Sequence, residues 1–74
     1  MITITVLKNK NNNKYGVYLA VDKETQLIEE FDKSGLAMIK LLSLGREIPF
    51  ATQRIDKETY KALGNGRPSG IEVI

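Results

Sequence analysis

Few side chains in this sequence could carry out a reaction, because it contains neither histidine nor cysteine. Histidine is the usual general acid or base near neutral pH, and imidazole and thiolate groups are the usual zinc ligands. Ser34, Ser43 and Ser69 therefore have no histidine that could activate them as nucleophiles. The sequence predicts a protein that is not an enzyme, with no catalytic residue, no metal site and no cofactor.

A basic, asparagine-rich segment near the amino terminus supplies the first candidate binding residues. Lys8, Lys10 and Lys14 surround four asparagines, and Tyr15 follows directly. Lysine and asparagine are suited to phosphate contacts, and an aromatic ring can stack on a base. Three charges neutralise few phosphates, however, and no arginine precedes Arg46. We interpret the segment as a solvated loop first and as a nucleic-acid contact second.

An acidic segment follows, in which Glu29, Glu30 and Asp32 lie close together. Carboxylates bind hard cations such as Mg²⁺, but the segment lacks the ladder of Asp and Asn, the glycine and the closing Glu of a calcium loop. We interpret it as a solvated face, and its functional alternative is an acidic patch that docks on a basic protein partner.

Arginines occur only in the second half of the chain, as Arg46, Arg54 and Arg67. The planar guanidinium group is common at interface anchors and phosphate contacts because it bonds bidentately. The three positions fall near the ends of expected elements, and sequence spacing does not decide whether they converge. They are candidate binding residues whose default interpretation is scattered surface arginines.

The segment that looks most like a motif is ALGNGRPSGI, at residues 62–71. Its glycines lack the spacing and the strand-to-helix setting of nucleotide-binding loops. The NGRP stretch resembles the Arg-Gly-Arg-Pro core of an AT-hook, but Asn65 stands in place of the first arginine. We interpret the segment as a turn into a last strand, in which Gly64 ends a helix and Pro68 holds Arg67 extended.

Hydrophobic periodicity places these residues on secondary structure. Ile2, Ile4 and Val6 alternate with threonines, and a second alternation over residues 15–21 completes a predicted hairpin. Residues 22–32 fit a third strand or a helix, and we favour the strand. A main helix is expected over residues 34–45, with Ser34 as its cap and Gly45 at its end.

The remaining elements are shorter. Apolar residues alternate over residues 48–54, which predicts a strand, and Pro49 restricts this strand to an edge or places it at a strand start. A helix is expected over residues 57–63, and a last strand is expected over residues 69–74. The tetrapeptide DKET occurs twice, at residues 22–25 and 56–59. Only the second copy has the apolar pair, Ile55 and Tyr60, of a hydrophobic staple around an Asp cap. We therefore predict a turn at the first copy and a helix start at the second.

The element order predicts an α+β fold, β-β-(β)-α-β-α-β, with a single-layer sheet of four or five strands packed on one main helix and a short helix. The layout, with strands at both ends of the chain and a helix across the sheet, is similar to a β-grasp. The 74 residues suit a single compact domain, and 42% of them are hydrophobic, which is enough for one core.

Charge and composition limit the function further. The net charge of +2 is too small to indicate nucleic-acid binding by itself. The absence of cysteine, of an apolar run long enough to span a membrane and of a signal-peptide pattern favours a cytoplasmic protein. Short proteins rich in Asn and Lys are typical of phages and mobile elements of AT-rich bacteria.

Two functions remain open at this stage. We expect a non-catalytic protein-binding module, an inhibitor or adaptor that docks on a larger partner through the edge regions at residues 49–54 and 69–74 or through its charged faces. The alternative is a small nucleic-acid-binding domain that uses the basic hairpin tip. A homodimer formed through the last strand is an open alternative to a monomer.

Overall fold

The computed structural model describes residues 1–66 and 68–74, which form a five-stranded sheet, two α-helices and a short 3₁₀ helix. The elements follow the order β1 (Ile2–Asn9), β2 (Lys14–Val21), β3 (Glu24–Phe31), α1 (Ser34–Glu47), β4 (Thr52–Ile55), α2 (Lys57–Leu63), η1 (Gly64–Gly66) and β5 (Glu72–Val73). The α+β fold and the element order expected from the sequence are confirmed.

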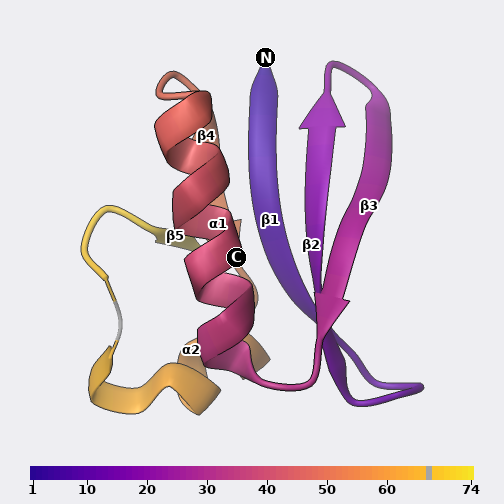
Figure 1. Cartoon of the computed structure of the whole chain (residues 1–74), viewed down its shortest axis with the longest axis vertical. Helices are drawn as coiled ribbons and strands as arrows, with labels where there is room; N and C mark the ends of the chain where they lie inside the picture. Colours follow the sequence, from indigo (N-terminus) through magenta and orange to yellow (C-terminus); the bar gives the residue numbers. More distant parts are fainter. Residues whose placement is uncertain (67) are drawn as a thin grey trace.

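The strands are arranged in the order β3-β2-β1-β4-β5, so the first strand lies in the middle of the sheet (Figure 1). β1, β2 and β3 form an antiparallel meander, whereas β4 pairs in parallel with β1 and β5 pairs in parallel with β4. β4 therefore separates the first and last strands, which are neighbours in a β-grasp sheet. Figure 1 shows α1 lying across one face of this sheet.

The core forms where α1 packs against the central strands. Ile4 and Val6 of β1 and Val17 of β2 alternate toward the helix and are fully buried. Leu41 of α1 and Ile55 of β4 complete the centre of the cluster. The threonines between the buried residues of β1 point to the opposite face, as the period of two requires. One amphipathic helix and one face of the sheet thus account for the core.

The main helix differs from expectation at both ends. Lys33, not Ser34, occupies the N-cap position, and its side chain caps no amide. The helix continues past Gly45 to Glu47, and Gly45 is buried inside it. A Cβ atom at Gly45 would lie 2.5 Å from Nε2 of Gln53, so this glycine permits close packing of α1 on β4 and does not end the helix.

The two DKET copies adopt the two predicted structures. In the first copy, Asp22 takes a positive φ of 56° in the tight turn between β2 and β3. In the second copy, Asp56 is the N-cap of α2, and its carboxylate accepts a hydrogen bond from the Thr59 amide. The third strand is therefore confirmed over Glu24–Phe31.

The strand expected at residues 48–54 is present but shorter, and its predicted edge position is wrong. The chain turns over Ile48–Ala51, where the Ala51 amide donates to the Ile48 carbonyl, and β4 begins only at Thr52. β4 lies between β1 and β5, so it is not an edge. β5 is an edge strand but contains only two residues.

The glycine-rich segment after α2 is a connection, as predicted. Gly64 takes a positive φ of 55° at the C-cap of α2, and the chain continues as the 3₁₀ helix over Gly64–Gly66. This short helix forms part of the connection that we predicted as a turn into the last strand. Arg67 lies outside the described residues.

Candidate functional site

The face of the sheet opposite α1 is covered by neither helix in the described part of the chain, and we call it the open face. α1 contacts β1, β2 and β3, and α2 packs beside α1 against β1. Side chains that alternate away from the core line a depression of about 440 Å³ on the open face; they are Thr3, Thr5, Leu7, Tyr18, Ala20, Thr25 and Arg54. Four strands of the sheet contribute to this surface.

Tyr18 of β2 is the aromatic residue that lines the depression on the open face. A Cβ atom at Gly16 would lie 2.8 Å from Cε1 of the Tyr18 ring, so the ring lies against the backbone of Gly16. Thr5 is paired with Tyr18 on one side, and Leu27 is paired with it on the other. Because Leu27 is 46% exposed, the centre of the open face is an apolar strip flanked by threonine hydroxyls.

Arg54, a predicted binding residue, lies at one side of the open face. Its Nε atom is 3.3 Å from Oε1 of Glu72 on the neighbouring strand β5. The two side chains form an ion pair without hydrogen-bond geometry at Nε. The pair balances its own charge, so this side of the open face has neither a strong positive nor a strong negative character.

The opposite side of the sheet ends at β3, an eight-residue strand that pairs only with β2 among the described residues. Figure 1 shows no element beside its outer edge. The register shifts between the Val17–Glu29 and Tyr18–Leu27 pairs, so Ile28 is an extra residue at a β-bulge. Charges and bulges are the usual features that keep an exposed edge from pairing with copies of itself.

Acidic side chains follow this edge, and we call Glu24, Glu29 and Glu30 the acidic edge. The strand pairing places Glu24 and Glu29 on the α1 side and Glu30 on the open face. Glu29 lies 4.0 Å from Nζ of Lys40 on α1. Asp32, the third residue of the predicted acidic patch, follows β3 directly and is exposed.

The basic hairpin tip lies next to Glu30, at one end of the acidic edge. The Asn12 side-chain amide donates a hydrogen bond of 3.4 Å to Oε2 of Glu30. Lys10 and Lys14 are exposed, in the turn and at the start of β2. The negative charges of the acidic edge oppose the attraction of the nearby lysines for phosphate.

Tyr15, predicted as a binding residue, is part of the core. It is 8% exposed, and the Lys8 ammonium lies 5.8 Å from the centre of its ring. A ring held in this way cannot stack on a base. Lys8 is therefore engaged with Tyr15, and only Lys10 and Lys14 project freely from the tip among the described residues.

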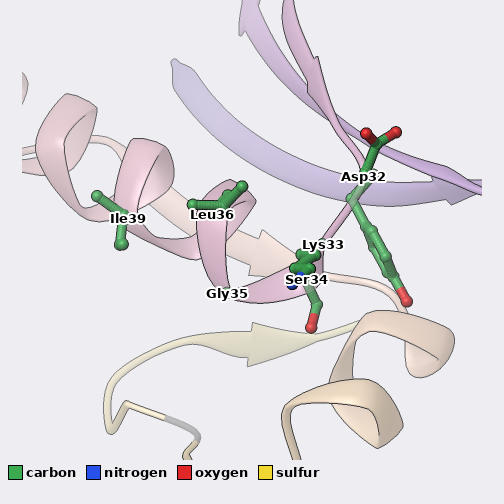
Figure 2. Close-up of a pocket in the computed structure, with 7 residues that line it drawn as sticks. Asp32, Lys33, Ser34, Gly35, Leu36 and Ile39 are labelled. Carbon is green, nitrogen blue, oxygen red and sulfur yellow. The ribbon is translucent and has the colours of Figure 1, made fainter.

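A second depression, of about 630 Å³, lies at the start of α1 (Figure 2). Its lining residues are Tyr15, Asp32, Lys33, Ser34, Gly35, Leu36 and Ile39. Leu36 and Ile39 are 49% and 66% exposed, and Figure 2 shows them projecting from α1. The Asp32 carboxylate and the Ser34 hydroxyl point in opposite directions, so they do not form a pair that could transfer a proton.

The remaining predicted residues do not join a common site. Arg46 lies in the last turn of α1, where a positive charge favours the helix dipole. It is separated by the length of α1 from the hairpin tip. Among the described residues there is no group of three or more acidic side chains placed to hold a metal ion. No helix in this part of the chain is long and apolar enough to cross a membrane.

Sequence reasoning missed the open face and the β3 edge as surfaces. A signal for the open face was present, because Thr3 and Thr5 alternate with buried residues and two helices are enough to cover only one face of a five-stranded sheet. The edge position of β3 depends on strand order, which periodicity does not reveal.

Comparison with known proteins gives no relative. No family model matches the chain, and neither a curated protein nor a solved structure matches it.

Proposed function

We propose that the chain is a non-catalytic protein-binding module, an inhibitor or adaptor that docks on a larger partner through the open face. The observation that carries the proposal is the uncovered depression lined by Leu7, Tyr18 and their threonine neighbours. A sheet face without a helix layer leaves apolar groups in water, and covering them is favourable by about 25 cal/mol for each Å² buried.

The chemistry of the open face also suits a protein partner. Tyr18 offers a large, rigid side chain at the centre, and tyrosine is enriched at the centre of interfaces. Threonine hydroxyls provide donors and acceptors around it. Because Arg54 is balanced by Glu72, the face requires no strongly charged ligand. The sequence has neither histidine nor cysteine, and the described residues of this face include no group of acids placed to hold a metal ion.

A matched pair of alanine-to-lysine variants tests the proposal. Ala20 lies on the open face, whereas Ala62 is exposed on α2. Both substitutions add one positive charge and one long side chain, at a half-buried strand position in Ala20→Lys and at an exposed helix position in Ala62→Lys. Tagged wild-type protein and both variants are used to capture partners from nuclease-treated lysate of the source cells, and the captured protein is quantified.

We expect one stoichiometric protein to be retained by the wild type and by Ala62→Lys and lost with Ala20→Lys, with both variants folded by circular dichroism. Equal retention of the captured protein by both variants would show that the partner does not dock on the open face. Recovery only in the absence of nuclease would indicate a nucleic-acid ligand and overturn the proposal.

A further inference from the structure

We propose that the partner adds an extended, lysine- or arginine-bearing segment to the outer edge of β3, so that the sheet of this protein continues into the partner. The inference rests on the proposed protein-binding function and names the chemistry of the partner. It follows from three features of β3: its free edge, its charge and the different character of its two faces.

The free edge provides the backbone contacts. β3 spans Glu24–Phe31 and, among the described residues, pairs with β2 on one side only. Alternate residues of such a strand direct their N–H and C=O groups outward, where an added strand can accept and donate hydrogen bonds. The other edge of the sheet, β5, has two residues and offers far fewer of these groups. A partner strand can therefore form more backbone hydrogen bonds at β3 than at β5.

The negative charge of this region disfavours pairing of β3 with a second copy of the chain and favours pairing with a basic partner. Residues 22–32 contain five acidic residues and only Lys23 as a base. Pairing two copies of β3 would bring the acidic edges of both together, which is unfavourable. A segment with positive side chains is instead attracted by the acidic side chains of β3. The same acids thus prevent self-association and attract a basic strand.

The two faces of β3 specify the pattern of that strand. Glu24 and Glu29 lie on the α1 side, where basic side chains of the partner would project. Leu27 and Thr25 lie on the open face, next to Tyr18 and Ala20. Apolar side chains of the partner would extend the strip at the centre of the open face. Glu30 lies on the open face beyond the bulge at Ile28. Over Glu24–Leu27, before that bulge, the expected segment therefore alternates basic and apolar residues.

The probe is an eight-residue peptide with blocked ends, in which four lysines alternate with four valines. One control peptide carries glutamate in place of lysine. Two further controls carry N-methyl groups on alternate residues, one on each edge of the strand, which removes the hydrogen-bond donors of that edge. Binding is measured by NMR titration at low salt, together with amide hydrogen exchange.

We expect the lysine peptide to bind and to slow exchange at alternate amides of β3. The glutamate peptide and one of the two N-methylated peptides should not bind. Binding with no change of exchange in β3, or equal binding of both N-methylated peptides, would exclude strand addition. Absence of binding by the lysine peptide would overturn the inference.

Variants of the protein test the charge requirement. Glu24→Gln with Glu29→Gln should weaken binding of the lysine peptide about tenfold, whereas the control pair Glu47→Gln with Glu58→Gln, which changes net charge equally, should leave it unaltered. Lys40→Ala should strengthen binding, because it frees Glu29 from its ion pair. Equal weakening by the two glutamine pairs would show a general charge effect and overturn the assignment to β3.

Failure of strand addition at β3 and failure of the proposed function give different experimental results. If the captured protein is lost with Ala20→Lys but is retained by the Glu24→Gln, Glu29→Gln variant, the open face binds a partner and the β3 edge does not. If no protein is captured, the proposed function itself fails.

Discussion

The carboxylate of Asp56 joins two segments of the chain that lie 48 residues apart in sequence. Its Oδ2 atom accepts a hydrogen bond of 3.0 Å from the Lys8 amide at the end of β1, and its Oδ1 atom accepts one of 2.9 Å from the Thr59 amide in the first turn of α2. One side chain therefore caps the helix and fixes the end of the central strand.

Replacement of this carboxylate should destabilise the fold more than loss of an ordinary helix cap. We expect Asp56→Ala to lower the free energy of unfolding by about 2–3 kcal/mol, because the cap is lost and the partly buried Lys8 amide is left without its acceptor. Urea denaturation measures the change. Asp32→Ala, at an exposed position with no hydrogen bond among the described residues, should change stability by less than about 0.5 kcal/mol. Equal effects of the two would contradict the double role of Asp56.

Gly45 and Gln53 should be energetically coupled. Alanine is favoured over glycine in a helix by about 1 kcal/mol, but a Cβ atom at Gly45 would lie within 2.5 Å of the Gln53 amide. We expect Gly45→Ala to stabilise the Gln53→Ala variant by about 1 kcal/mol and to stabilise the wild type less or destabilise it. A double-mutant cycle by thermal or urea unfolding gives the coupling. Additive effects would show that the Gln53 side chain moves aside without cost.

Two leucines of α1 should respond very differently to truncation. Leu41 is fully buried against the sheet, whereas Leu36 is half exposed at the second depression. We expect Leu41→Ala to cost about 3 kcal/mol through lost burial and the cavity left behind, and Leu36→Ala to cost less than about 1 kcal/mol. Chemical denaturation of both variants checks the prediction. A large loss for Leu36→Ala would mean that the depression is covered in solution.

The lysines of the hairpin tip should give little nucleic-acid binding. Glu30 of the acidic edge contacts Asn12 of the tip, and Lys8 is held over Tyr15. We expect no electrophoretic retardation of single-stranded DNA or duplex RNA at 50 mM salt. The Lys8→Ala, Lys10→Ala, Lys14→Ala variant should behave like the wild type. Binding that is lost in this variant and falls steeply with salt would instead support the nucleic-acid hypothesis.

Local sequence signals predicted most elements of the fold. The alternation of Ile4 and Val6 with threonines identified β1, and the Asp56 cap with its staple pair identified the start of α2. The end of α1 was missed because Gly45 resembles a helix terminator in sequence, and only its contact with Gln53 explains its place inside the helix. Hydrophobic periodicity gives information about residues that are close along the chain, but it does not identify which residues are neighbours across the sheet.

The candidate site was harder to predict for the same reason. The charges of Glu29 and Glu30 were recognised, but their position on a free edge depends on the order of the strands. Tyr15 was interpreted as a binding residue because aromatic groups near lysines often bind nucleic acid. Its alternation with Val17 places it on the core side, so the same pattern that identified β2 also assigns Tyr15 to the interior.

The parallel pairing of β1 with β4 has a consequence for how the chain reaches this structure. β1, β2 and β3 are linked by tight turns, so their contacts are local and should form early, whereas β4 can join β1 only after α1 has crossed the sheet. Until then β1, which becomes a central strand, is a bare edge rich in isoleucine and valine. Folding speed and aggregation during refolding should therefore depend on how quickly α1 and β4 close over that edge.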